Sequence, residues 1–151
     1  MGAGTSATQM IFFITSVIIA LGVVGALFLN IQSITTSATM GSKTFSEQLR
    51  TDIIIINDPE KIPNSSEIYT FYVKNTGKED LSTQYINVII DGSLVPDGNL
   101  NKTILNSVNG GAVWIPGDVL QINATVIINT GSHSLRVITE NGIEDSFEFR
   151  R

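Results

Sequence analysis

The first 42 residues of the chain carry no charged side chain, although the 151 residues include 9 Lys and Arg and 14 Asp and Glu. Within this segment, residues 10–29 form a predominantly apolar run without Pro, Asn or Gln. A helix of about twenty residues spans roughly 30 Å, the thickness of the hydrocarbon core of a bilayer. The run therefore predicts a single transmembrane helix. A Ser or Thr in the polar lead-in at residues 2–8 is expected to cap it.

Small residues in the apolar run favour contact between helices. Gly22 and Ala26 lie four residues apart, and Gly25 lies between them. Such residues let two helix backbones approach closely within lipid. We expect these three positions to pack against another helix, with simple anchoring by one span as the alternative.

An apolar stripe continues beyond the expected span. Its positions are three or four residues apart, with Gly41 filling one gap, so they lie on one side of a helix. Uncharged Ser, Thr, Asn and Gln flank it until residue 43. This pattern predicts an amphipathic helix that reaches about residue 50 and assembles with copies of itself, with a flexible Ser/Thr stalk as the alternative. The stripe consists of Ile31, Ile34, Ala38, Phe45 and Leu49.

Composition excludes several functional classes. The net charge is −5 and no cluster of Lys or Arg occurs, which argues against nucleic-acid binding. The absence of cysteine excludes disulfides, thiolate metal sites and cysteine nucleophiles. His133 is the single histidine, and no G-x-S-x-G turn accompanies it. We expect a surface histidine at the start of a strand, no cofactor and no enzymatic activity.

Residues 51–151 show short apolar runs separated by turn residues, which predicts an antiparallel β-sandwich of the immunoglobulin type, with a partly open barrel as the alternative. With the helix at 1–50, the fold class is α+β and mainly β. Trp114 is expected in the core or at a corner. Asn141 and Gly142 predict a type I′ hairpin between the last two strands. Seven strands are expected, at 52–56, 68–75, 85–90, 111–115, 119–128, 134–139 and 144–150.

Three N-x-S/T sequons are candidate glycosylation acceptors. Asn64 and Asn101 fall in expected loops, whereas Asn123 falls within an expected strand, so the first two are the stronger candidates. Oxygen side chains in one expected loop are a weaker candidate calcium site, because their spacing differs from that of an EF-hand. These side chains belong to Asp91, Asp97, Asn99 and Asn101.

Several segments carry a resemblance to a known family. Residues 49–59 read LRTDIIIINDP and are followed by Ile62-Pro63, by TFYVKNTGK at 70–78 and by IDG at 90–92. With the N-terminal helix, these segments resemble the archaellin and stator group of the archaellum, and within it the G-type stator proteins. The resemblance implies a subunit anchored in the cytoplasmic membrane with its β-domain in the pseudo-periplasm. It also implies self-assembly into short filaments and contact with the F-type stator protein, and through it with the S-layer.

Archaellins carry a basic residue and glycine before the apolar run and a glutamate soon after its start. The segment before residue 10 has no Lys, Arg or Glu. This departure predicts an unprocessed stator subunit rather than an archaellin or pilin-like filament subunit. A membrane-tethered module that binds an envelope partner is a further alternative. The segments 57–63 and 76–81 are expected to contact other β-domains.

Overall fold

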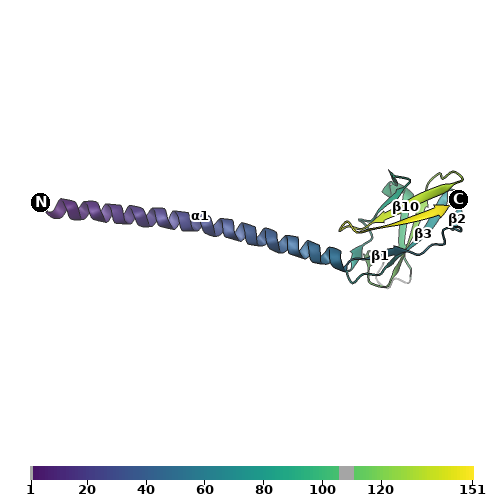
Figure 1. The fold of residues 1–151 in the computed structure, drawn as a ribbon, viewed down its shortest axis with the longest axis horizontal. Helices are drawn as coiled ribbons and strands as arrows, with labels where there is room; N and C mark the ends of the chain where they lie inside the picture. Colours follow the sequence, from purple (N-terminus) through teal and green to yellow (C-terminus); the bar gives the residue numbers. More distant parts are fainter. Residues whose placement is uncertain (1, 106–110) are drawn as a thin grey trace. The chain divides into compact units, whose positions relative to one another are not determined.

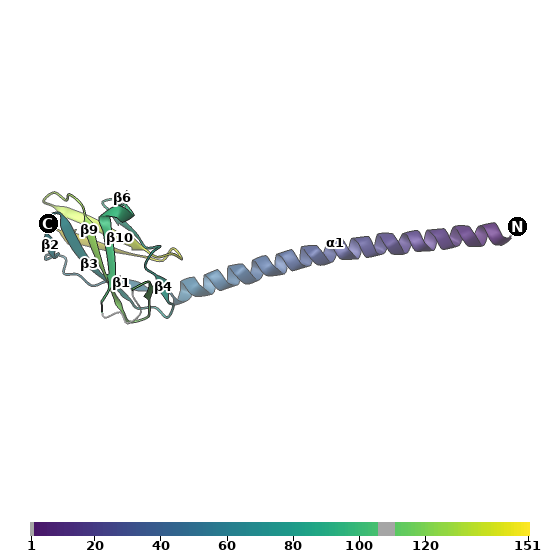
Figure 2. The same cartoon turned by 180° about the vertical axis from the view of Figure 1, so that it is seen from behind.

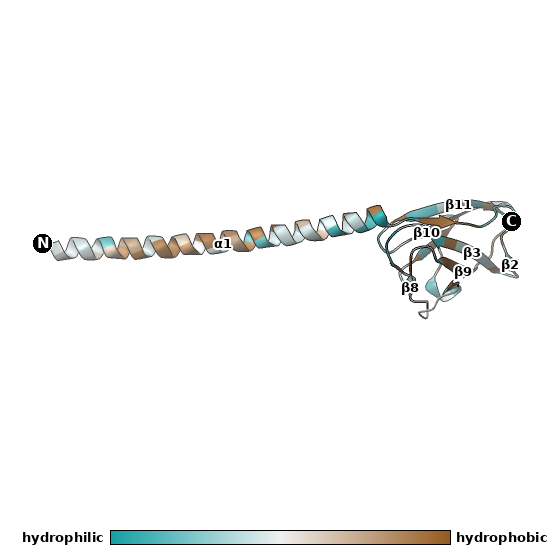
Figure 3. Ribbon diagram, turned by 90° about the horizontal axis from the view of Figure 1, so that it is seen from below, coloured by the Kyte–Doolittle hydropathy of each residue, from teal (hydrophilic) through white to brown (hydrophobic). Residues whose placement is uncertain are grey.

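The computed structural model describes residues 2–105 and 111–151. The chain divides into two compact units, Met1–Lys43 and Thr44–Arg151. Helix α1, Gly2–Arg50, is one uninterrupted helix, so the residues beyond the apolar run are helical rather than a flexible stalk (Figure 1). Figure 3 shows its most hydrophobic stretch between paler turns at either side. By length and composition, α1 is long and apolar enough to cross a membrane.

The polar lead-in belongs to the helix, so the expected cap at residues 2–8 is wrong. The helix begins at Gly2, and the Thr5 and Thr8 hydroxyls donate to the carbonyls of Gly2 and Gly4 rather than accept from the amides of its first turn. Four further hydroxyls along the helix each donate to the carbonyl four residues earlier. They belong to Thr35, Thr36, Ser37 and Thr39. Each hydroxyl proton is therefore satisfied within its own helix.

The strands form two main antiparallel sheets and one short pair. The larger sheet has the order β1-β3-β9-β7, with β2 also paired to β3, and the second has the order β11-β10-β5-β6. Figure 2 shows β1, β3 and β9 side by side. The strands are β1 Ile53–Ile55, β2 Asn64–Ser65, β3 Ile68–Asn75, β4 Leu81–Ser82, β5 Asn87–Ile90, β6 Ser93–Leu94, β7 Leu100–Ile104, β8 Val113–Trp114, β9 Val119–Thr125, β10 Ser132–Ile138 and β11 Glu144–Arg150.

The core lies between the two main sheets. Alternate residues of β3 are buried, and Phe71 sits opposite Ile122 of β9 in the register. The rings of Phe71 and Phe149 meet edge to face with centroids 5.4 Å apart, which joins the larger sheet to the second sheet. Trp114 is completely buried, as expected, and its Nε1 donates to the carbonyl of Asp118 at 2.9 Å.

The sequence predicted the architecture correctly, a long helix followed by antiparallel sheets, but it missed four strand segments: β2, β4, β6 and β7. Strand β7 has no regular apolar alternation, and its Lys102 points inward. The Lys102 ammonium donates to the carbonyl of Ile86 at 2.8 Å and pairs with Asp97 at 3.0 Å. An inward charge on an edge strand disfavours pairing with further strands.

The hairpin between β10 and β11 differs from the expected type I′ turn. The two strands do pair, from Ser132↔Arg150 to Ile138↔Glu144. Only Gly142 of the two central residues has a positive φ, 82°. The Gly142 amide donates to the carbonyl of Thr139, and the Thr139 amide donates to that of Ile143. This arrangement is a three-residue loop in which glycine supplies the left-handed position.

Candidate functional site: assembly surfaces and the helix joint

The predicted stripe on α1 is exposed throughout. Ile34 is 68% exposed, and Ile31 is 60% exposed. Phe45 and Leu49 are 61% and 71% exposed although they belong to the same compact unit as the sandwich. Ala38 is also exposed. A large apolar side chain costs about 1.5–3 kcal/mol to expose to water, so this stripe favours cover by lipid or by another protein.

The small residues Gly22, Gly25 and Ala26 are exposed on α1 as well. No atom lies within 4 Å of the place where a Cβ would stand on Gly22 or Gly25. The fold of the single chain therefore does not require glycine at either position. These small side chains leave room for the close approach of a neighbouring helix or of lipid, and helix packing at these residues remains a prediction.

The last turn of α1 is hydrogen-bonded to the β10–β11 hairpin. The side-chain amide of Gln48 donates to the carbonyl of Asn141 at 2.8 Å. The Asn141 amide donates to the hydroxyl of Thr51, which in turn donates to the carbonyl of Glu47. Thr51 is buried, and the bonds of this chain are partly buried.

The loop after β3 closes the other side of this joint. The amide of Lys78 donates to the carbonyl of Arg50 at 2.7 Å, and the Arg50 guanidinium pairs with Glu79 at 3.0 Å. A Cβ on Gly77 would lie 2.5 Å from the Asp52 amide nitrogen and 2.6 Å from the Arg50 carbonyl oxygen. Only glycine fits between these backbones without movement.

Replacing Gln48 tests the hairpin side of the joint. Gln48→Ala is expected to lower the free energy of unfolding of the sandwich by about 1 kcal/mol, because one partly buried hydrogen bond is lost. Gln84→Ala, at an exposed loop residue, is the matched control and should change it by less than about 0.5 kcal/mol. Denaturant unfolding of the full chain in detergent measures both changes. If the two variants change the free energy of unfolding equally, the Gln48 bond does not stabilise the sandwich.

Both loops expected to contact other β-domains make internal bonds. In the segment 57–63, the Asn57 amide bridges to β3, the carbonyl of Pro59 accepts from Arg150, and that of Pro63 accepts from Thr70. The segment thus links β3 of the larger sheet to β11, the edge strand of the second sheet. The segment 76–81 holds the end of α1, as described above. Contacts with other copies at either segment remain predictions.

The two stronger sequons lie in strands, not in the expected loops. Asn64 is in β2 and Asn101 is in β7, and both side chains are exposed. Asn123 lies within β9 as expected, and its side-chain oxygen accepts from Thr70 and Gln121. Asn64 and Asn101 therefore remain the more accessible acceptors, and their modification remains a prediction.

His133 is the second residue of β10, at the start of the strand as expected, and its side chain is partly covered, with 13% exposed. Its Nδ1 lies 2.6 Å from Asp91 Oδ2, and its Nε2 lies 2.8 Å from the carbonyl oxygen of Asn129. Asp91 Oδ1 accepts from the amide of Ser134 at 2.9 Å. The hydrogen bond to Asp91 raises the pKa of His133, and the bond from Ser134, followed by the contact with His133, lowers the pKa of Asp91.

The expected calcium ligands are engaged elsewhere. The Asp91 carboxylate binds His133 and Ser134, and that of Asp97 binds Lys102. Within residues 2–105 and 111–151, no group of three or more His, Cys, Asp or Glu side chains is placed to hold a metal ion. A groove of about 560 Å³ lies nearby, between the β5–β6 turn and the segment after β9.

The long helix, which carries no charge through residue 42, exposes an apolar stripe, as is typical of a subunit that packs against other molecules. The model of archaeal-type flagellins matches residues 2–149, and the chain belongs to this family. It is 28% identical to a flagella-related protein G of Methanococcus voltae over 149 residues, which cover 93% of each chain. The expected resemblance to the G-type group is thereby confirmed.

Two solved structures are also similar to the chain. The archaellum periplasmic stator protein FlaG from Sulfolobus acidocaldarius matches 66% of this chain and 99% of its own, with 22% identity and a TM-score of 0.44. The complex of FlaF and FlaG from the same organism matches 62% of this chain and 96% of its own, with 20% identity and a TM-score of 0.40. The family and its relatives are structural components of the archaellum, not enzymes.

Proposed function

We propose that the protein is a membrane-anchored structural subunit of the archaellum stator that assembles with copies of itself through α1. Its place in the archaeal-type flagellin family supports a structural role in the archaellum. Its similarity to a protein G, over nearly the full length of both chains, favours the stator group within that family.

The observation that carries the proposal is the length of the exposed helix, which carries no charge through residue 42. Helix α1 has 49 residues and therefore extends about 73 Å, whereas a bilayer core covers about 30 Å. The residues from 30 to 42 continue an apolar stripe beyond the predicted span without a charge. The nearby Thr36 and Ser37 hydroxyls already donate to carbonyls of their own helix. Burying this surface against another helix therefore leaves few hydrogen-bond donors without an acceptor.

The proposed location and partners are those that the resemblance to the G-type stator proteins implies. We propose one span in the cytoplasmic membrane, with the β-domain in the pseudo-periplasm, where it contacts the F-type stator protein and through it the S-layer. This part of the proposal rests on the segments quoted above that resemble the G-type proteins. The last turn of α1 is bonded to the sandwich by the Gln48 amide and the Arg50–Glu79 ion pair, and a subunit that bears load would use such a tie.

A second candidate is a filament subunit, which the flagellin family model favours. Cell fractionation distinguishes the two. If archaella are sheared from cells, a stator subunit remains with the membranes, whereas a filament subunit leaves with the filaments. Electron microscopy of the purified protein tests the third alternative, because short filaments support self-assembly and dispersed monomers support a tethered binding module.

A further inference from the structure

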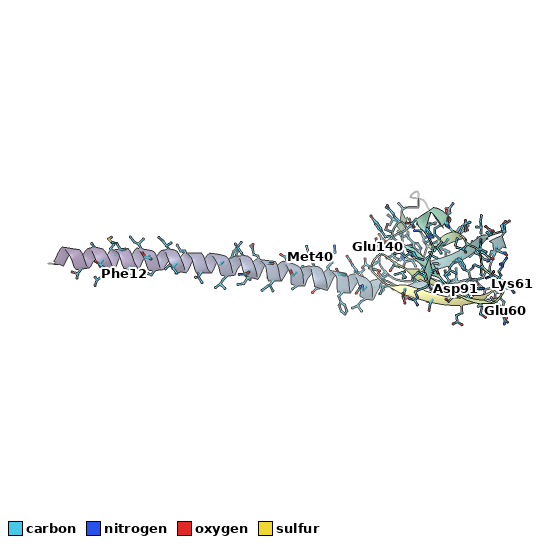
Figure 4. The ribbon with its side chains drawn as sticks, turned by 90° about the horizontal axis from the view of Figure 1, so that it is seen from above. Phe12, Met40, Glu60, Lys61, Asp91 and Glu140 are labelled. Carbon is cyan, nitrogen blue, oxygen red and sulfur yellow. The ribbon has the colours of Figure 1, made fainter. Side chains whose placement is uncertain are left out.

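One histidine joins two segments at the end of the sandwich opposite the joint with α1. Strand β3 ends at Asn75 beside that joint and begins at Ile68, which pairs with Thr125 at the end of β9. The segment 126–131 follows β9 at this far end. Figure 4 shows Glu140 and the pair Glu60 and Lys61 toward opposite ends of the sandwich, with Asp91 between them in the view.

The contacts of His133 require both of its ring nitrogens to be donors. Asp91 Oδ2 accepts at Nδ1, and the carbonyl oxygen of Asn129 accepts at Nε2. The carbonyl oxygen of Asn129 has no proton to donate, and the bond from the Ser134 amide to Oδ1 lowers the pKa of Asp91 and so favours its ionised carboxylate, which only accepts. Neutral imidazole has one N–H, so it satisfies only one of the two contacts. The geometry is that of an imidazolium ion.

We propose that His133 is a proton-dependent latch that holds the segment 126–131 against the β5–β6 turn. When the ring loses a proton, one of its two bonds is lost, and the tie between Asn129 and the turn is broken. Val126 stays bonded to the Glu67 carbonyl and Gly131 to Arg151, and Ile128 stays buried, so the release is confined to the residues around Asn129. These two elements form opposite walls of the groove of about 560 Å³, which Leu94 and Ile127 line. Ile127 is 81% exposed, so release of the segment changes the apolar surface at this end of the molecule.

The groups around the ring set the direction of the switch. Asp91 faces Nδ1 from the β5–β6 turn, and the Phe149 ring of β11 packs beside the imidazole with centroids 5.7 Å apart. The Arg151 guanidinium, which follows β11, opposes the positive charge, and the segment 126–131 contributes no titratable side chain. The Asp91 bond dominates and raises the pKa of His133.

The sign of the pH dependence follows from this raised pKa. The latch contributes its full stabilisation below the ordinary histidine pKa of about 6.5, and the contribution is lost as the pH rises through the raised value. We therefore expect the residues around Asn129 to be held against the turn at pH 6 and released from it in alkaline solution. The latch does not depend on helix assembly or on the stator role.

Because His133 is the only histidine, its ring resonances are identified without assignment. An NMR titration of the 15N-labelled full chain in detergent is expected to show a midpoint above 6.5, with both ring nitrogens protonated below it. Asp91→Asn should lower this midpoint, and Asp97→Asn, at an acid that pairs with Lys102 instead, should leave it unchanged. A wild-type midpoint at or below 6.5 would overturn the proposal.

Hydrogen exchange tests the release itself. After correction for intrinsic rates, the amides of residues 127–130 are expected to lose protection about tenfold between pH 6 and a pH one unit above the measured midpoint. The amides of Val126 and Gly131, which donate to Glu67 and Arg151, should keep theirs. His133→Gln should exchange at the faster rate at both pH values. The proposal is wrong if this variant shows the same pH-dependent loss as the wild-type chain, or if the wild-type chain shows none.

Discussion

Two carboxylates placed on the stripe of α1 are expected to abolish self-assembly. Phe45→Glu with Leu49→Glu replaces two exposed apolar side chains that lie four residues apart. In the proposed assembly each new carboxylate would be buried against a neighbouring helix without a partner, at a cost of several kcal/mol. We expect the critical concentration for assembly to rise at least about a hundredfold, measured by sedimentation and electron microscopy of the purified protein.

The matched control places the same two charges off the stripe. Gln32→Glu with Thr36→Glu keeps the spacing of four residues, and Thr36 lies about 200° around the helix from Ala38. This control should assemble like the wild-type chain. If the Phe45 and Leu49 variant still forms filaments, the stripe is not the contact between copies.

Gly77→Ala is expected to have the largest effect on the stability of the sandwich. The new methyl group would meet the Asp52 amide nitrogen and the Arg50 carbonyl oxygen at 2.5 and 2.6 Å, and backbone atoms do not move aside as a flexible side chain does. We expect a loss of about 3 kcal/mol in the free energy of unfolding, together with a disrupted end of α1. Denaturant unfolding of the full chain measures the loss.

Gly98→Ala is the control for Gly77→Ala. Gly98 has open space around its Cβ position, and its φ is not positive. This variant should lie within about 0.5 kcal/mol of the wild-type chain. If the two variants are equally stable, the close approach of Gly77 to the end of α1 does not require glycine at that position.

The sequence predicts the parts of the fold that depend on local patterns. A charge-free apolar run predicts the helix, and alternation over residues 68–75 predicts β3 with its correct bounds. Strand β7 was missed because its residues read LNKTI, in which a lysine occupies an inward position. Its place depends on Ile86 and Asp97, which receive the Lys102 ammonium, and this pairing has no local sequence signal.

The joint and the histidine latch could not be predicted for a related reason. Gln48 and Asn141 are 93 residues apart in the chain, and Asp91 and His133 are 42 apart. Each residue alone is typical of a helix end, a turn or a strand start. The glycine at position 77 gave one usable signal, since an Asn-Thr-Gly turn directly after a strand favours a close backbone approach.

Disulfide crosslinking tests self-assembly through α1 most directly, because the chain contains no cysteine of its own. Ala38→Cys places one thiol on the stripe, and Thr36→Cys places one on the opposite side of the same helix. On oxidation of membranes that contain each variant, we expect Ala38→Cys to give crosslinked dimers and Thr36→Cys to give few or none. Equal crosslinking of both variants, or none at Ala38→Cys, would contradict assembly through this stripe.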